Sequence, residues 1–170
     1  MADYCYHNMF AECTAIEKAP ELPATKLKEY CYYCMFDGCT ALTEVPDLPA
    51  EDLPEQCYHW MFLGCKELVK GPKISAATIS QYSCNGMFSS CAKLSSVALL
   101  MPNDEIEKNV PYGLQNWLGD NTGTSATTRT LVVKDKAAYD ALKSKSYLPS
   151  QWQIGSSCTV LNESGSPITE

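Results

Sequence analysis

A short sequence pattern recurs through the first 94 residues, and it constrains the fold more than any other feature. Its three clear copies follow the order Cys-Tyr-x-x-Met-Phe-x-x-Cys-x-x-Leu or Ile, and they occupy Cys5–Ile16, Cys31–Leu42 and Cys57–Leu68. A weaker copy runs from Ser83 to Leu94. The four methionines of the pattern recur with a constant 26-residue period, at Met9, Met35, Met61 and Met87. A fixed period of this length predicts a solenoid, in which each repeat forms one coil.

The apolar run that follows each copy predicts a short strand. In the second copy this run is Leu42–Pro49, and its equivalents are Ile16–Pro23, Leu68–Ser75 and Leu94–Met101. Proline has no main-chain donor, so it ends a strand ladder or lies where the strand is unpaired. We therefore expect Pro20, Pro46 and Pro72 to keep the strand short.

The Cys-Tyr-x-x-Met-Phe segment predicts a short helix. Cys31 and Met35 are separated by four residues, and Tyr32 precedes Phe36 by the same interval, which places them on one helical face. Gly38 follows soon afterwards and suits the left-handed position that ends a helix. One coil would then consist of strand, turn, short helix and turn.

These repeats resemble the BspA-like leucine-rich repeats, a family common on the surfaces of gut and oral bacteria. Family units carry Ala-Phe-x-x-Cys-x-x-Leu, and this chain has Met35-Phe36-x-x-Cys39-x-x-Leu42 in the second copy. Met replaces the usual Ala, and Cys31 stands where the family has Ile or Leu. The resemblance covers about Cys5 to Leu118. It implies an α/β fold: a short right-handed leucine-rich-repeat solenoid of about four 26-residue coils plus a degenerate fifth, with a small α+β C-terminal cap.

We expect the solenoid to occupy residues 1–118 and the capping segment residues 119–170. The predicted units are 5–30, 31–56, 57–82, 83–108 and the degenerate 109–118. In the last unit Gly113 lies one full period after Met87, so Leu114 would replace the phenylalanine and Trp117 the cysteine. A large aromatic side chain there would close the end of the core.

The capping segment carries its own signals. Residues 119–128 are rich in Gly, Thr, Ser and Asn and predict a loop, and Thr130–Lys134 predicts a strand. Asp135 is a suitable N-cap for a helix through Lys143. A last short strand is expected to begin at Trp152.

Seven of the ten cysteines follow the repeat register, as core residues do. Stacked buried thiols are the main interpretation, and structural disulfides and metal or redox chemistry remain alternatives. Cys31-x-x-Cys34 is the only pair of the CxxC type. Cys34 matches the variable residues Asn8, Trp60 and Gly86, so we expect Cys31 to be buried and Cys34 exposed.

Several function classes are disfavoured by the sequence. The formal charge of −7 argues against a nucleic-acid partner, and no apolar run of membrane-spanning length occurs. His7 and His59 stand two coils apart, about 10 Å by strand spacing, which is too far to share one metal ion. No nucleophile elbow or phosphate loop is present. We expect no enzyme activity, no metal and no cofactor.

The variable positions between the repeat residues are the candidate binding surface, because solenoids bind through extended faces. On the helical side, Tyr33, His59 and Trp60 would form an aromatic anchor patch unless they pack on the neighbouring coil. On the strand side, the candidates are Glu17, Lys18, Thr43, Glu44 and Lys70.

The resemblance implies a non-enzymatic binding module for a protein of host or bacterial surfaces, or for matrix, with an extracellular or cell-surface location. The alternative is a structural spacer or stalk with no ligand of its own. No signal segment precedes Cys5, so we expect the chain to be a fragment of a longer protein. An uncapped first coil would also expose an apolar edge that favours association.

Overall fold

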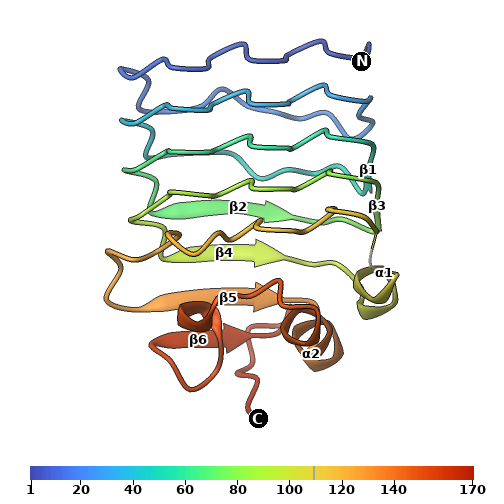
Figure 1. Ribbon diagram of the computed structural model, residues 1–170, viewed down its shortest axis with the longest axis vertical. Coiled ribbons are helices and arrows are strands. Elements are labelled where there is room, and N and C mark those ends of the chain that lie inside the picture. The colour runs from blue at the N-terminus through green and yellow to red at the C-terminus, as the bar shows by residue number, and fades with distance from the viewer. Residues whose placement is uncertain (109) are drawn as a thin grey trace.

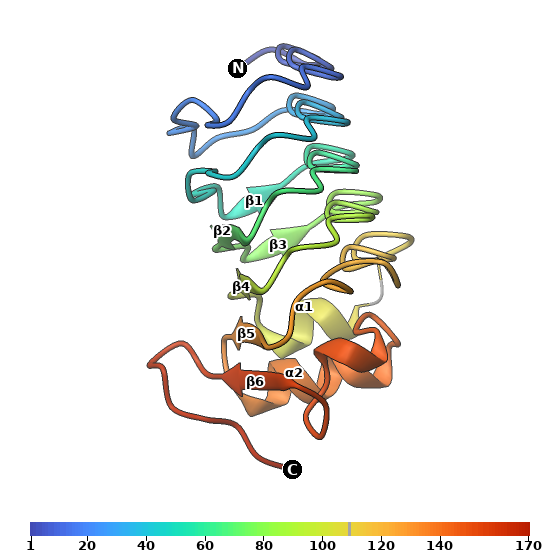
Figure 2. The ribbon, with the colours of Figure 1, turned by 90° about the vertical axis from the view of Figure 1, so that its left-hand side faces the viewer.

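The computed structural model describes residues 1–108 and 110–170. It contains small parallel sheets and few helices, with the chain wound into coils that lie one on another from the N-terminus to the C-terminus (Figure 1). Each coil has a side of linked turns, which we call the turn ribbon, and an opposite side where neighbouring coils pair in parallel. The strands expected in Ile16–Pro23 and Leu42–Pro49 do not form: these segments have only isolated bridges, such as Lys18 with Glu44 and Leu48 with Ile74. Figure 2 shows the two sides separated across the stack.

The turn ribbons stand where a helix was predicted, and that prediction is wrong. In the second coil the N–H groups of Tyr30, Tyr32 and Cys34 donate to carbonyls of the third coil at 3.0–3.1 Å. The alternate N–H groups, including that of Tyr33, donate to the carbonyl three residues back. Residues with positive φ recur every four positions, at Tyr30 (57°), Cys34 (49°) and Gly38 (71°). Each group of four residues is thus a β-turn. The remaining N–H groups of the ribbon bond to the ribbon of the next coil.

The helix prediction failed because two periods are nearly the same over a short segment. A helix repeats every 3.6 residues and the turn ribbon every four, so both place Cys31 and Met35 on one face. The left-handed conformation costs a residue other than glycine roughly 1–2 kcal/mol. We attribute its regular recurrence to the hydrogen bonds that each ribbon makes with the next.

The repeat residues form ladders inside the stack. Cys31, Phe36 and Cys39 have no exposed surface, and Met35 is 1% exposed. The phenylalanine rings of successive coils stack, with centroids 5.4 Å apart for Phe10–Phe36, 5.6 Å for Phe36–Phe62 and 5.5 Å for Phe62–Phe88. In the second, third and fourth coils the thiol of the later cysteine of the pattern donates to a phenylalanine carbonyl of the preceding coil, as Cys65 does to Phe36 at 3.2 Å. The cysteines therefore pack as small apolar residues that also join the coils.

The opposite side of the stack is a four-stranded parallel sheet in the order β2-β4-β5-β6. Its strands are β2 (Lys70–Ile74), β4 (Ser96–Leu99), β5 (Arg129–Val133) and β6 (Cys158–Leu161). The pairing of β2 with β4 shifts between Lys70 and Lys73, around Pro72, which agrees with the expected effect of a proline. A third side carries the short parallel pair β1 (Asp52–Leu53) and β3 (Thr78–Ile79).

The short helix α1 (Asn103–Glu107) lengthens the fourth coil and changes the register of the fifth. The Phe36 and Phe62 N–H groups donate to the methionine carbonyl of the next coil, and the Phe88 N–H donates to the Trp117 carbonyl. Trp117 therefore stands in the methionine register, and its predicted place in the cysteine register is wrong. Thr122 takes that place, because its hydroxyl donates to the Phe88 carbonyl at 2.7 Å.

The C-terminal segment continues the sheet beyond residue 118, because β5 pairs in parallel with β4 and β6 pairs in parallel with β5. Helix α2 (Lys136–Ser144) begins as expected, with the Asp135 carboxylate accepting from the Ala138 N–H at 2.8 Å. Trp152 does not begin a strand: it ends the 3₁₀ helix η1 (Ser150–Trp152), and β6 starts only at Cys158. Its buried indole donates to the Thr122 carbonyl at 3.0 Å, which anchors η1 to the loop before β5.

Candidate functional site

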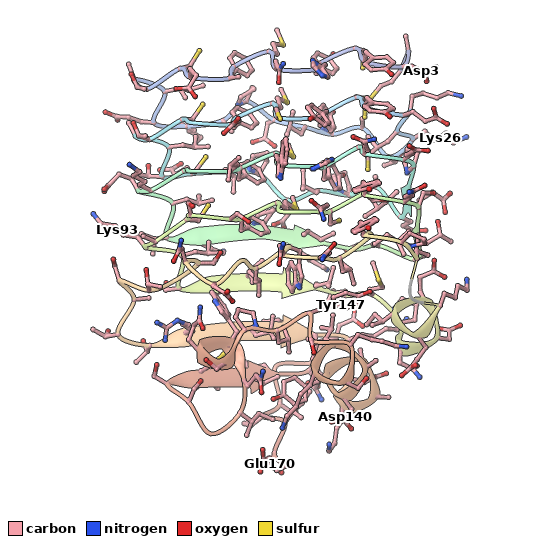
Figure 3. All side chains as sticks on the ribbon, viewed as in Figure 1. Asp3, Lys26, Lys93, Asp140, Tyr147 and Glu170 are labelled. Carbon is pink, nitrogen blue, oxygen red and sulfur yellow. The ribbon has the colours of Figure 1, made fainter. Side chains whose placement is uncertain are left out.

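Aromatic side chains line the outside of the turn ribbons in two adjacent rows. The first row occupies a left-handed position of each ribbon, and the second lies three residues further along the chain. We call the two rows, together with the neighbouring tryptophan, the aromatic face: Tyr4, Tyr30, Tyr82, Tyr112, His7, Tyr33, His59 and Trp60. In Figure 3 the side chains of successive ribbons lie above one another.

The rings of the aromatic face contact one another across the coils. Tyr4 stacks on Tyr30 with centroids 4.6 Å apart, and His7 stacks on Tyr33 at 4.7 Å with an interplanar angle of 4°. Near the other end, Tyr82 and Tyr112 repeat the geometry of the first pair at 4.6 Å. Each such pair contributes roughly 0.5–1.5 kcal/mol beyond its buried area, so the face is held in shape before any ligand arrives.

The predicted anchor patch is assembled, but His59 is not an exposed part of it. The His59 ring centroid lies 4.4 Å from that of Trp60 and 5.1 Å from that of Tyr33. His59 is nevertheless only 7% exposed, because Tyr82 stacks on it at 5.6 Å. Its predicted outward position is therefore wrong, and Tyr33 and Trp60 supply the accessible surface.

The hydrogen bonds of His59 define its chemical form. The Gln56 Nε2 donates to the Tyr30 hydroxyl at 2.7 Å, so the Gln56 Oε1 is the acceptor that faces His59 Nδ1 at 3.1 Å. Nδ1 must then carry the hydrogen, which leaves the buried Nε2 without a partner among the described residues. Burial lowers the pKa of His59 to about 4, so the ring is neutral at physiological pH.

Trp60 combines an exposed edge with close packing on the next coil. It is 39% exposed, and its indole lies over Gly86, where an added Cβ would come within 2.4 Å of Trp60 Cδ1. Tyr33 is half-buried, and burial is the main cause that raises its pKa. Both anchor side chains are thus partly packed and partly accessible, which is the environment in which aromatic residues dominate binding energy.

The strand-side candidates do not join the aromatic face: Lys18 and Glu44 form a parallel bridge between the first two coils, and Lys70 begins β2. Glu17, Lys18, Thr43, Glu44 and Lys70 are all exposed. The Lys18 ammonium lies 3.0 Å from the Glu44 carboxylate, and the Thr43 hydroxyl donates to the Glu17 carbonyl at 3.0 Å. Four of the five residues therefore connect the first coil to the second.

All ten cysteines are free thiols, and the expected exposure of Cys34 is wrong. Cys34 is only 6% exposed, and burial raises the pKa of both Cys31 and Cys34 to about 11. A redox cysteine instead needs a lowered pKa and access to solvent. In the described residues no three His, Cys, Asp or Glu side chains converge as metal ligands would. The helices described are all too short or too polar to cross a bilayer.

The sequence reasoning missed half of the aromatic face, namely the tyrosines at the left-handed positions. Tyr4, Tyr30 and Tyr82 are spaced by whole multiples of the repeat period, and this spacing was the available signal. Tyr112 follows Tyr82 by more than one period because α1 intervenes, so its place in the row could not be found from the period.

Comparisons of the chain with models of known protein families, with curated proteins and with solved structures found no match.

Proposed function

We propose that this chain is a non-enzymatic binding module that contacts a protein partner through the aromatic face. The observation that carries the proposal is the unbroken series of ring contacts across five turn ribbons, from Tyr4 to Tyr112, in which every ring except that of His59 is at least partly exposed. Tyrosine and tryptophan offer large contact areas with few rotatable bonds, so a pre-stacked row loses little entropy on binding. The centre of the site is the patch of Tyr33 and Trp60, whose ring centroids are 6.1 Å apart.

We also infer that the coils are a variant of the leucine-rich-repeat solenoid, resembling the BspA-like family in sequence, with turn ribbons in place of helices. The 26-residue spacing of the repeat residues supports this inference. The same resemblance suggests a cell-surface or secreted bacterial protein whose partner is a host, matrix or bacterial surface protein. The net charge of −7 is in keeping with a protein partner rather than nucleic acid.

The test is direct binding of the purified chain to a panel of purified matrix and mucosal proteins. The double variant Tyr33→Ala/Trp60→Ala should lose binding by about 100-fold, as expected for two central aromatic residues. The matched control is Lys18→Ala/Glu44→Ala, which removes the exposed ion pair on the strand side and should keep wild-type affinity. No binding to any member of the panel, or equal binding by the Tyr33/Trp60 variant, would contradict the proposal.

A spacer without a ligand is the second candidate function, and the strand side favours it. The polar groups there are used between coils: Lys18 pairs with Glu44, Lys93 with Glu67 at 2.6 Å, and Ser95 donates to the Val69 carbonyl. A surface whose polar groups hold the stack together suits a stalk. If the spacer is the only function, the Tyr33/Trp60 variant will leave every activity of the protein unchanged.

A further inference from the structure

A cleft of about 520 Å³ opens where the last turn ribbon meets the segment after α2. The fifth ribbon contributes Tyr112, Gln115 and Asn116 to its lining, and Lys145 and Ser146 line the other wall. Figure 3 labels Tyr147, another lining residue, where this ribbon approaches α1 and α2. The cleft lies on the side of the fifth ribbon away from the fourth, where the ribbon of a sixth coil would be.

Two main-chain donors face this position. In the fourth ribbon the left-handed residues Tyr82 and Gly86 donate their N–H groups to the fifth coil, at 3.3 Å and 3.0 Å. The corresponding residues of the fifth ribbon, Tyr112 and Asn116, have the same conformation, with φ of 57° and 54°. Within residues 1–108 and 110–170, however, neither of their N–H groups has a hydrogen-bond partner. The cleft therefore offers two N–H donors that are four residues apart. In every earlier ribbon the two equivalent N–H groups donate to main-chain carbonyls of the next coil.

The aromatic row also continues into the cleft. Tyr82 has a ring on either side, with His59 at 5.6 Å and Tyr112 at 4.6 Å. Tyr112 stacks on Tyr82 and is 48% exposed, so it can accept a further ring. The one cation that lines the cleft, Lys145, lies 3.6 Å from the Glu107 carboxylate, which offsets its charge. The cleft is thus rich in donors and aromatic surface without being a strong anion site.

We propose that this cleft binds an extended peptide segment of a partner protein through the peptide's main chain. Carbonyl groups of the segment accept from the N–H groups of Tyr112 and Asn116, and an aromatic side chain of the segment stacks on Tyr112. The binding mode corresponds to the addition of a strand to a sheet edge, in which main-chain hydrogen bonds supply affinity. Tyr112 also belongs to the aromatic face, but the cleft does not include the Tyr33–Trp60 patch at the centre of that face, so this proposal stands if the patch binds nothing.

The chain itself provides a probe, a peptide that copies residues 27–42 with both ends blocked. In the folded protein this segment offers the Glu29 and Tyr33 carbonyls to the first ribbon at 3.0 Å, and its Tyr30 stacks on Tyr4. The peptide would be titrated into the ¹⁵N-labelled full chain in reducing buffer. We expect saturable shifts of the Tyr112 and Asn116 amide resonances.

A matched pair of variants identifies the binding end. Tyr112→Ala should weaken peptide binding about tenfold through loss of the ring stack. Tyr4→Ala removes the equivalent ring from the opposite end of the row, with the same stacking distance and nearly the same φ, and should bind as the wild type does. A peptide carrying Tyr30→Ala should bind the wild-type chain more weakly, and this measurement needs no protein variant.

Three outcomes would overturn the proposal. The first is the absence of shifts at Tyr112 and Asn116 at millimolar peptide. In the second, Tyr4→Ala loses binding and Tyr112→Ala retains it, which would place the peptide on the first coil. In the third, only a peptide with a free terminal carboxylate binds, which would make the cleft an anion site.

Discussion

The two ends of the stack are built from the same repeat, but they bury their repeat residues to very different extents. In the first coil Met9 is 56% exposed and Tyr6 is 38% exposed, although the equivalent Met61 and Tyr58 of the third coil have no exposed surface. At the other end Trp117, in the methionine register, is fully buried. Its indole N–H donates to the Tyr147 carbonyl at 2.9 Å, so the segment after α2 covers the last coil.

The difference shows that a repeat residue becomes core only when a neighbour covers it on both sides. The first coil has a ribbon on one side, and its outer side carries an apolar hollow of about 440 Å³ lined by Tyr6, Met9 and Phe10. The last coil replaces methionine by tryptophan and cysteine by threonine, and both new side chains hydrogen-bond into the structure around them. The C-terminal end of the stack is thus covered because its last coil carries different residues at the repeat positions, and not because a further copy of the repeat follows.

Thiol labelling should show the largest contrast. Cys5 and Cys13 are exposed on the first coil, whereas the register-equivalent Cys57 and Cys65 of the third coil are fully buried. The exposed pair should react with a thiol reagent at least roughly 100-fold faster, because buried thiols react only after local opening. Mass spectrometry of a timed labelling series checks this, and similar rates for the two pairs would show that the inner coils open readily.

Stability should respond unequally to substitution at the two ends. We expect Trp117→Ala to lower the free energy of unfolding by about 3–5 kcal/mol, as removal of a large buried aromatic ring does. Met9→Ala removes an exposed side chain in the same register and should cost less than about 1 kcal/mol. Urea unfolding of both variants measures the difference. Equal losses would mean that the first coil is covered in solution.

Replacement of Thr122 tests whether its hydroxyl contributes to stability through the bond to the Phe88 carbonyl, as the cysteine thiols of earlier coils bond to the preceding phenylalanine carbonyl. Thr122→Val preserves the shape but removes the 2.7 Å hydrogen bond to the Phe88 carbonyl, which keeps only the Cys91 N–H as a donor, at 3.1 Å. The loss should cost about 0.5–1.5 kcal/mol, the net contribution of one hydrogen bond. Thr122→Cys restores the thiol donor of the other coils and should cost less. If the two variants unfold at the same urea concentration, the hydroxyl contributes nothing at this position.

A smaller effect on stability is expected from acid, and it comes from the buried ring of His59. Burial lowers the pKa of His59 from 6.5 to about 4, so the unfolded chain binds this proton at a higher pH than the folded chain. The stability from the neutral ring is present above about pH 6.5 and is lost as pH falls towards 4.

Urea unfolding between pH 7 and pH 4 measures this loss. The His59→Gln variant should lose part of the acid dependence, because glutamine binds no proton in this pH range. An unchanged acid dependence in this variant would show that another group is responsible.

Much of the inner structure could be predicted from the sequence because it depends on residues at a constant spacing. The 26-residue period placed Cys31, Cys57 and Phe62 in the core, where all three are fully buried. Asp135 predicted the start of α2, because an N-cap acts within a single turn. The repeat register also placed Tyr33 and Trp60 on adjoining coils, where their rings are in contact, but their role in binding stays a prediction.

The tertiary structure decided what depends on contacts between coils. A spacing of four residues suits both a helix and a ribbon of turns, and only the hydrogen bonds to the neighbouring coil distinguish them. The burial of His59 depends on the Tyr82 ring, which stacks on it from the next coil and is not contained in the sequence of its own repeat. Helix α1 moved Trp117 and Thr122 into registers that counting from Met87 could not find. The spacing of the core residues follows from the sequence alone. The conformation of each repeat, and the place where the stack ends, depend on contacts between coils.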